Sequence, residues 1–311
     1  YATRNFLINN YELAPKISYL FSKNASLDVF YEFKNQENTI NLLEKATQNK
    51  FGTSFTFNSE KGFSINGEYA YYDNNFTGNA TSPVGFQMLK EGSIDAFASA
   101  GNSGAMLVGS MFSVKTIPGM NRPAICSYLP KENGGFGVIL DVGANADCKP
   151  ELLVQFAILG SLVAEILFGI KNPKVGLLNI GEEAEKGNLL TQATYPLLKE
   201  TANINFIGNI EGRDLFNDKA DVIVCDGFTG NIVLKLSETF HDMTAGKGMD
   251  APFFARLNYE NYGGSPVLGV NAPVVVGHGI SNDIAIKNLI LLAKEMVSTN
   301  LTEKIKAAFK E

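Results

Sequence analysis

Apolar residues along the chain fall into short runs, each followed by a polar loop and a longer, largely apolar stretch. The clearest case lies between Phe136 and Gly169, where the β-branched run Val138–Val142 precedes a Gly/Asn/Asp loop and a segment that begins at Pro150. A short apolar run of this kind is typical of a strand covered on both faces, and Pro is favoured in the first turn of a helix. The pattern therefore predicts a buried strand, a loop and a long helix.

The same succession of strand, loop and helix occurs four more times. Strands that run parallel need a crossover, which is usually a helix, so five such units predict a right-handed, doubly wound α/β fold. Its sheet is expected to be mainly parallel with helices on both faces, and all five loops are expected at one sheet edge, where ligands bind in such folds. The four further strands are predicted at Ile94–Ser99, Val175–Asn179, Asp221–Cys225 and Pro273–Val276.

Two segments depart from this pattern. Residues 1–85 are rich in Asn, Phe, Tyr and Ser; we expect a helix over Glu37–Gln48 and a half-exposed strand over Phe51–Phe57, where apolar and polar residues alternate. We assign 1–85 to a diverged amino-terminal part of the α/β domain and 86–311 to its main, catalytic part. The Gly- and Pro-containing segment 238–264 is expected to form a helical excursion.

Composition narrows the class of protein. With 311 residues and 45% hydrophobic content, the chain can bury a large core. Its net charge of −6 argues against a general nucleic-acid binder, and three cysteines suit a reducing, cytoplasmic compartment. The segment Leu152–Ile170 is apolar enough to suggest a membrane span, but Gln155 and Glu165 interrupt it. We therefore expect a helix buried against the sheet.

Four asparagines stand beside Gly or Ala in the predicted strand-end loops. Amide side chains and exposed backbone N–H groups bind anions, so the loops with Asn102, Asn145, Asn188 and Asn231 predict an anion site. The alternative is turn chemistry, because Gly and Asn both tolerate left-handed backbone. Lys186 is the best candidate for a cation facing the anion, although a surface pair with Glu182 or Glu183 is the alternative.

Further candidates follow the last two predicted strands. His278 lies between two glycines and could donate to a phosphate or protonate a leaving group, or it could only cap the next helix. Asp226 could orient a donor or cap a helix. Cys148 and Cys225 could carry a covalent acyl group, but neither has an adjacent His in the sequence.

Several blocks of the sequence resemble the bacterial phosphate acyltransferase (PlsX) family. They appear in family order between residues 82 and 310: GNSGAMLVGSMFSVKTIPGMNRPAI, DVGANADCKPELLVQFA, VGLLNIGEEAEKGN, NFIGNIEGRDLF, ADVIVCDGFTGNIVLK, NYGGSPVLGV and GHGISNDIAIKN. The family is similar in fold to isocitrate and isopropylmalate dehydrogenases and to phosphotransacetylases. The resemblance implies transfer of a long acyl chain from acyl carrier protein to inorganic phosphate, giving acyl phosphate for phospholipid synthesis, with no cofactor or metal.

On this basis we assign roles to the candidates. Phosphate is already largely dianionic at neutral pH, so the enzyme mainly has to hold it and stabilise the developing oxyanion. We expect a catalytic role for Lys186, Asn231 and His278. Substrate or phosphate binding is expected at Gly101, Asn102, Ser103, Gly104, Asn145, Asn188, Asp226 and Gly230.

Partners follow from charge, apolar surface and the resemblance. Acyl carrier protein is acidic, so docking requires a local basic surface, which we place at Lys247 and Arg256. Nearby Met and Phe residues could contact the acyl chain or a membrane surface. We expect a cytoplasmic homodimer, with peripheral contact to the inner face of the membrane as an option. The apolar segments expected at the dimer interface are Ser281–Thr299 and Met111–Ile117.

The sequence leaves alternatives to this function open. Family members usually carry a Gly-Gly-Asp phosphate loop after their first strand, and no Gly-Gly-Asp occurs in residues 1–85. A catalytically impaired or non-enzymatic binding protein of the same fold is one alternative, and a phosphotransacetylase-like enzyme that uses another thioester is a second. A metal- and nicotinamide-dependent dehydrogenase is a third, but the chain has few arginines to bind substrate carboxylates.

Overall fold

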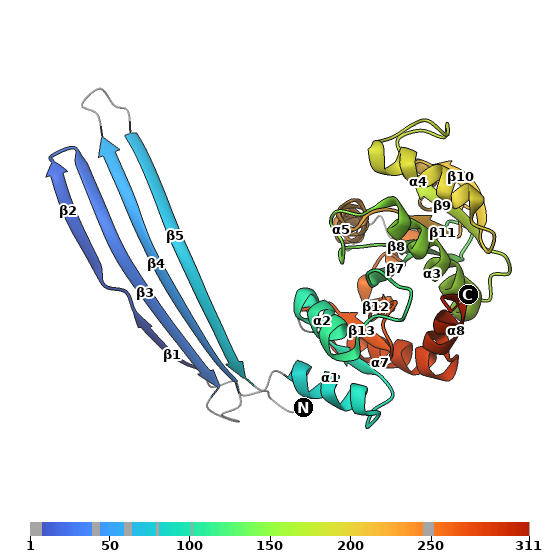
Figure 1. The fold of residues 1–311 in the computed structure, drawn as a ribbon, viewed down its shortest axis with the longest axis horizontal. Helices are drawn as coiled ribbons and strands as arrows, with labels where there is room; N and C mark the ends of the chain where they lie inside the picture. Colours follow the sequence, from blue (N-terminus) through green and yellow to red (C-terminus); the bar gives the residue numbers. More distant parts are fainter. Residues whose placement is uncertain are drawn as a thin grey trace. The chain divides into compact units, whose positions relative to one another are not determined.

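The chain divides into two compact units, Tyr1–Val84 and Gly85–Glu311. The computed structural model describes residues 8–38, 44–58, 64–78, 81–100, 102–244 and 252–310 (Figure 1).

The described residues of the first unit form antiparallel strands. They are β1 (Ile8–Leu13), β2 (Lys16–Ser22), β3 (Ala25–Asn38), β4 (Glu44–Asn58) and β5 (Ser64–Gly78), in the order β1-β3-β4-β5 with β2 paired to β3.

This arrangement corrects two predictions. The helix expected over Glu37–Gln48 is wrong, because its described residues lie at the end of β3 and the start of β4. Pairing of β4 with strands on both sides outweighs the weak helical signal. The strand expected over Phe51–Phe57 is confirmed within β4. The described strands of this unit thus form an antiparallel sheet, and the assignment of 1–85 to a diverged amino-terminal part of the α/β domain stays a prediction.

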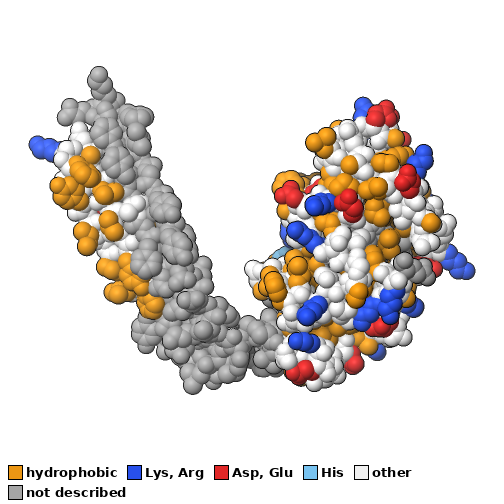
Figure 2. Space-filling view, in the orientation of Figure 1, with side chains coloured by type: hydrophobic (Ala, Val, Ile, Leu, Met, Phe, Trp, Pro, Cys, Tyr) orange, Lys and Arg blue, Asp and Glu red, His pale blue; other side chains and the backbone are white. Residues whose placement is uncertain are grey.

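Apolar side chains are exposed on the described part of this sheet. Ile17, Tyr19 and Phe21 alternate along β2 and are each at least 60% exposed. Figure 2 shows the hydrophobic surface that they form with neighbouring residues. Alternate residues of a strand point to the same face, so these three side chains form one apolar stripe.

The second unit is built on a mixed sheet. Its described strands run in the order β10-β9-β11-β8-β7-β12-β13-β6 (Figure 1). The strands are β6 (Phe97–Ser99), β7 (Ala124–Pro130), β8 (Phe136–Leu140), β9 (Lys174–Leu178), β10 (Asn205–Ile210), β11 (Val222–Val224), β12 (Gly264–Leu268) and β13 (Val274–Gly277). The helices are α1 (Thr81–Glu91), which begins at the end of the first unit, α2 (Ser103–Gly109), η1 (Ser110–Val114), α3 (Pro150–Phe168), α4 (Leu189–Glu200), η2 (Gly212–Asp214), α5 (Gly227–Thr244), α6 (Pro252–Ala255), η3 (Tyr259–Asn261), α7 (Asp283–Ser298) and α8 (Leu301–Ala308).

The sheet is mostly parallel, as predicted, but its strands do not all run in one direction. β8, β11, β9 and β10 are parallel to one another, whereas β7 is antiparallel to both β8 and β12. β12 in turn is antiparallel to β13, which is parallel to β6. Consequently β6 and β13 run opposite to β8, β9 and β11. The five strand-end loops therefore do not share one edge of the sheet as predicted, although four of them contribute residues to one cavity, namely Ser103, Gly143, Asn231 and His278.

Two hydrophobic cores lie on opposite faces of this sheet. Along β8, Val138 and Leu140 belong to one core and Ile139 to the other, as the two-residue period of a strand requires. The first core contains residues of α3, α7 and α8, and the second contains residues of α1 and α2 together with partly buried side chains of α5. Helices therefore cover both faces, as the strand and helix pattern predicted.

Helix α3 is apolar enough in length and composition to cross a membrane. In the structure its side chains pack on the sheet and on α4 and α8, and residues such as Leu153, Phe156 and Leu159 are fully buried. This placement agrees with the predicted core helix, which begins at Pro150.

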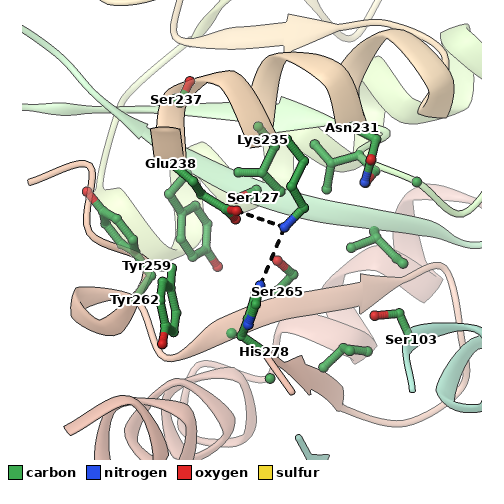
Figure 3. Close-up of a pocket in the computed structure, with 18 of the residues that line it drawn as sticks. Ser103, Ser127, Asn231, Lys235, Ser237, Glu238, Tyr259, Tyr262, Ser265 and His278 are labelled. Carbon is green, nitrogen blue, oxygen red and sulfur yellow. Dashed lines mark hydrogen bonds and ion pairs between the residues drawn. The ribbon is translucent and has the colours of Figure 1, made fainter. Parts of the chain in front are cut away.

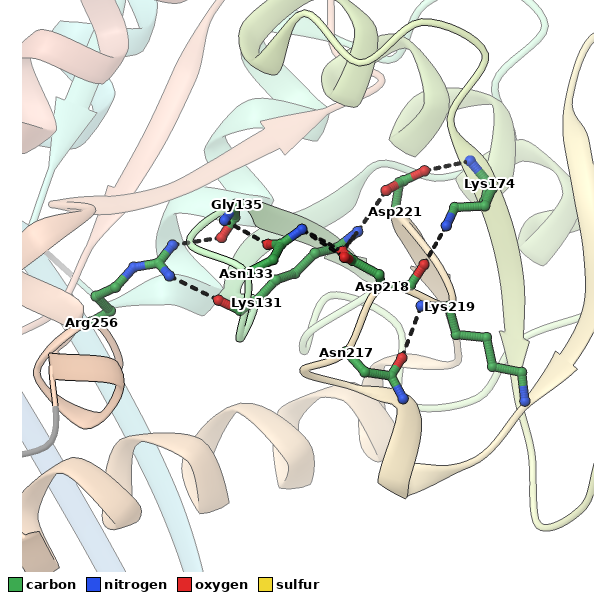
Figure 4. A network of polar contacts seen from close by, with 9 residues as sticks. All are labelled: Lys131, Asn133, Gly135, Lys174, Asn217, Asp218, Lys219, Asp221 and Arg256. Carbon is green, nitrogen blue, oxygen red and sulfur yellow. Dashed lines mark hydrogen bonds and ion pairs between the residues drawn. The ribbon is translucent and has the colours of Figure 1, made fainter.

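A network of charged groups joins the β7–β8 hairpin to β9 and β11 (Figure 4). Lys131 is only 4% exposed, and its Nζ lies 2.6 Å from Asp221 Oδ1. Asp221 Oδ2 accepts a hydrogen bond from the backbone N–H of Lys174 at 2.8 Å. Arg256 donates to the carbonyl oxygens of Lys131 at 2.9 Å and Gly135 at 2.5 Å. A buried charge is tolerated when it is paired and hydrogen-bonded, as here.

Candidate functional site

The main candidate site lies where β7 and β12 diverge. These strands pair through Ile125 with Val267 and Ala124 with Leu268. Beyond these pairs, residues 127–130 of β7 and 263–265 at β12 line a cavity of about 250 Å³. The cavity is also lined by α5 and by the residues that follow β13. Strand divergence therefore creates a cavity within the sheet, next to α5.

One face of α5 supplies polar groups to this cavity. Asn231, Lys235 and Glu238 are four and three residues apart, so they lie on one side of the helix. Lys235 Nζ pairs with a Glu238 carboxylate oxygen at 2.7 Å, and the Asn231 amide donates to the carbonyl oxygen of Val142 at 3.1 Å. Figure 3 shows Lys235 reaching from α5 toward the strand residues on the other side of the cavity.

His278 faces Lys235 from the end of β13. Its Nε2 lies 3.5 Å from Lys235 Nζ, and the ring of Tyr259 stacks on the imidazole with centroids 4.8 Å apart (Figure 3). His278 Nδ1 is buried and has no hydrogen-bond partner among the described residues. Buried polar atoms in native proteins nearly always have a partner, so this nitrogen is a candidate contact for a ligand.

Of the predicted substrate-binding residues, Ser103 also lines the cavity, at the start of α2. The hydroxyls of Ser127 and Ser265 join it there. Three further predicted residues cap helices instead. Asn102 accepts from Ala105 N, Asn188 from Thr191 N, and Asp226 from both the backbone N–H and the hydroxyl of Thr229. Capping was the predicted alternative for Asp226; for Asn102 and Asn188 the alternative was turn chemistry, and both instead have extended backbone as N-caps.

Asn145 has a structural role in the strand-end loop after β8. Its amide donates to the carbonyl oxygen of Pro123 at 2.9 Å and to Asp141 Oδ2 at 3.0 Å, and the residue is 5% exposed. Asp141 is fully buried, and burial raises the pKa of its carboxyl, although hydrogen bonds from the loop oppose that shift. The Asn145 amide is therefore engaged within the protein, and its role in phosphate binding stays a prediction.

Gly230 allows α5 to pack closely against the end of β8. A Cβ atom there would lie 1.9 Å from the carbonyl oxygen of Asp141, so α5 and the end of β8 approach closely because the residue is glycine. Gly104 lies within α2 and Gly101 lies outside the described residues.

Lys186 is exposed in the loop between β9 and α4 and does not line the cavity. In the same region the carboxylates of Glu182, Glu211 and Asp214 have the mutual spacing of a cation site. However, Lys219 pairs with Glu182 at 2.6 Å and with Asp214 at 2.9 Å, and Arg213 pairs with Glu211. These cations already compensate the acidic group.

Of the two predicted docking residues, the structure describes Arg256. Both guanidinium contacts of Arg256 go to backbone carbonyls of the β7–β8 hairpin, and its Cζ lies 4.7 Å from the centroid of the Phe136 ring. The guanidinium of Arg256 is therefore held within the fold, and its role in docking stays a prediction. Lys247 lies outside the described residues.

Sequence reasoning missed Lys235, Glu238 and Tyr259 as site residues. The first two had a usable signal, because they follow Asn231 at the spacing that repeats on one face of a helix. No sequence signal pointed to Tyr259, because its contact with His278 joins two segments that are not related by any helix or strand period.

The cysteines are poorly suited to covalent catalysis. Burial raises the pKa of Cys148 to about 11 and, with smaller contributions from nearby carboxylates, raises the pKa of Cys225 well above its usual value. A thiol reacts as its thiolate, which is scarce at neutral pH when the pKa is high. We therefore expect Cys148→Ala to keep acyl-transfer activity within about twofold. A steady-state assay checks this, and complete loss of activity in a folded variant would contradict it.

Comparisons with known proteins agree with this architecture. A solved phosphotransacetylase from Streptococcus pyogenes superposes with a TM-score of 0.51 at 20% identity, covering 69% of this chain and 67% of that one, which shows a shared fold. A branched-chain phosphotransacylase from Enterococcus faecalis also gives a TM-score of 0.51, at 15% identity, covering 70% of this chain and 79% of that one.

Curated relatives are considerably closer in sequence. Proteins named phosphate acyltransferase from Halothermothrix orenii and Bacillus subtilis are 47% and 43% identical, over 242 and 252 residues. The first match covers 71% of this chain and 72% of the relative; the second covers 75% and 76%. The family model described as "Fatty acid synthesis protein" matches residues 33–246 and 249–304. The chain therefore belongs to the fatty acid synthesis protein family, whose curated relatives here are named phosphate acyltransferase.

Proposed function

We propose that the chain transfers a long acyl group from acyl carrier protein to inorganic phosphate and yields acyl phosphate for phospholipid synthesis. Family membership and the names of the relatives support acyl transfer to phosphate. The choice of acyl carrier protein as donor rests on the resemblance of the sequence blocks. The phosphotransacetylase fold of the solved neighbours is compatible with this class of reaction, and a relation to isocitrate dehydrogenase-like folds is part of the proposal.

The reaction requires an anion and a carbonyl to meet. A phosphate oxygen attacks the thioester carbon, a carbon–oxygen bond forms, the carbon–sulfur bond breaks, and the sulfur leaves as a thiolate that takes one proton. Lys235 holds the phosphate dianion through its charge, while Ser103 and Asn231 line the same cavity. Lys235 thus takes the role that we first expected for Lys186.

The single observation that carries the proposal is the geometry of His278. Its Nε2 lies beside the Lys235 ammonium, while its buried Nδ1 has no partner among the described residues. A ligand that binds Nδ1 removes an unsatisfied buried group. We assign this nitrogen to the phosphate or to the leaving sulfur, to which it can pass a proton.

The direct test is incubation of the full chain with palmitoyl-acyl carrier protein and phosphate, followed by measurement of acyl phosphate and free carrier thiol in equal amounts. Product with palmitoyl-coenzyme A but not with the carrier would favour the phosphotransacetylase-like alternative. Binding of phosphate without product from either donor would favour the impaired or purely binding protein.

We also propose a cytoplasmic homodimer. Ile284 and Ile290 on α7 are at least half exposed, and Phe112 in η1 is 77% exposed, so both predicted interface segments present apolar surface. Sedimentation should give about twice the chain mass of 33.7 kDa. A mass that stays at one chain at all concentrations would contradict this. Peripheral membrane contact remains a proposal from the Met and Phe residues of the segment 238–264.

A further inference from the structure

A second cavity, of about 630 Å³, lies among α3, α7 and the segment before β12. Its size falls within the range of about 300–1,000 Å³ that is usual for small-molecule sites. Much of its wall is apolar, and the side chains that matter here are Phe136, Leu167, Phe168, Leu291 and Leu292. Such a wall favours an apolar ligand.

Three polar side chains of the wall are already bonded within the protein, and a fourth, Glu295, belongs to an exposed residue whose carboxylate can stay in contact with solvent. Arg256 donates to the Lys131 and Gly135 carbonyls, Asn288 to the Glu260 carbonyl at 2.8 Å, and Asn261 to the Ala255 carbonyl at 2.9 Å. A polar ligand would have to compete with these bonds. A hydrocarbon needs no hydrogen bonds, so this wall suits a hydrocarbon.

Two tyrosines connect this cavity with the one that contains Lys235. Tyr128 on β7 and Tyr262 just before β12 line both cavities, and their ring centroids are 6.1 Å apart. Ser127 lines the first cavity beside α5, whereas Tyr128, the next residue of β7, belongs to the core that contains α3 and α7. The two cavities are therefore on opposite faces of the sheet and meet where β7 and β12 diverge.

Tyr128 has a further property at this junction. It is 6% exposed, and its hydroxyl has no hydrogen-bond partner among the described residues, whereas the Tyr262 hydroxyl donates to the carbonyl of Arg256. Moving the Tyr128 ring therefore breaks no hydrogen bond within the described structure. A ligand that crosses the junction can also supply the partner that the hydroxyl lacks.

We infer that the second cavity binds the hydrocarbon chain of the acyl donor, with the chain passing between Tyr128 and Tyr262 and the thioester lying in the first cavity. This inference rests on the proposed function. The first cavity, at about 250 Å³, is small for a thioester, a phosphate and a long chain together. The second supplies apolar volume next to it.

The substitution Leu291→Trp tests this inference. Leu291 lies in the cavity wall and is 48% exposed. A larger side chain there can therefore fill the opening of the second cavity without overpacking the core. Ile290→Trp is the matched control: Ile290 is the adjacent residue of α7, lies in the same predicted dimer segment, is 60% exposed and does not line the cavity, so it reproduces any effect of a tryptophan on the dimer alone. We expect Leu291→Trp to lower the ratio of kcat/KM for the palmitoyl donor to kcat/KM for the octanoyl donor by about tenfold. A change of this size corresponds to the loss of one or two buried methylene contacts. Ile290→Trp should leave this ratio unchanged.

A binding measurement separates the cavity from the reaction. Palmitate should displace a fluorescent fatty acid from the wild-type chain, and Leu291→Trp should weaken palmitate about tenfold while Ile290→Trp does not. If this holds but the wild type forms no acyl phosphate, the proposed reaction fails and the hydrocarbon site stands. Equal binding and equal chain-length ratios in both variants would overturn the site. If Leu291→Trp instead changes only the sedimentation coefficient, the surface is covered by a second copy and the inference is wrong.

Discussion

Replacing Lys235 by Met should lower kcat/KM for acyl phosphate formation by about 10²–10³-fold, by analogy with the loss of a single oxyanion-stabilising donor. The ammonium is the cation in the cavity wall, it lies 3.5 Å from His278 Nε2, and Met keeps its approximate length without its charge. Because the salt bridge with Glu238 is partly exposed, its loss should change stability little. Steady-state kinetics with varied phosphate, together with thermal unfolding, measures both effects.

Two controls sharpen this experiment. Lys199→Met removes an exposed lysine from the last turn of α4, away from the cavity, and should leave the rate unchanged. Lys235→Arg keeps the charge but changes its shape, so partial recovery would indicate that charge matters more than exact placement. If Lys235→Met folds normally and retains the wild-type rate and phosphate dependence, Lys235 has no part in the mechanism.

Replacing Lys131 by Met should lower the free energy of unfolding by about 3–5 kcal/mol, the usual cost of breaking a buried ion pair. Asp221 is 8% exposed, and its Oδ1 would lose the Lys131 Nζ at 2.6 Å while the carboxylate stayed buried. The variant leaves the residues of the Lys235 cavity unchanged. Urea unfolding measures the difference.

The matched control is Lys306→Met, which removes an ion pair of nearly the same length, 2.7 Å, to a Glu303 side chain that is 68% exposed. Surface pairs contribute only about 0–1 kcal/mol, so this variant should unfold close to the wild type. The double replacement Lys131→Met with Asp221→Leu should recover part of the loss, because no unpaired charge then remains buried. If both variants lowered the free energy of unfolding by the same small amount, burial would not strengthen the pair between Lys131 and Asp221.

Individual strands and helices of the second unit could be predicted because each depends on a pattern of residues that are close together in the sequence. The β-branched run before Pro150 and the apolar segment after it gave β8 and α3, with the helix beginning at the predicted residue. Strand direction could not be predicted in this way. An apolar run looks the same in either direction. The reversal of β13 and β6 depends on three antiparallel pairings, of β7 with β8, of β7 with β12 and of β12 with β13.

The site was predicted only in part, for a related reason. Asparagine at the start of a helix can bind an anion or cap the helix, and the local sequence is the same for both. The structure shows caps at Asn102 and Asn188 but brings Asn231 and His278 to the cavity. Contacts between distant segments decide between these roles.

The short pairing between β7 and β12 has a mechanical consequence. Lys235 belongs to α5, which packs on β8 on one side of that pairing, while His278 follows β13 on the other side. No single element holds Lys235 Nζ and His278 Nε2 at their distance of 3.5 Å. That distance depends on how the two parts of the sheet are joined, at the pairs Ile125–Val267 and Ala124–Leu268. A small rotation about these residues, as in hinge motions, would change the distance between Lys235 and His278 much more than it would change distances within a single strand.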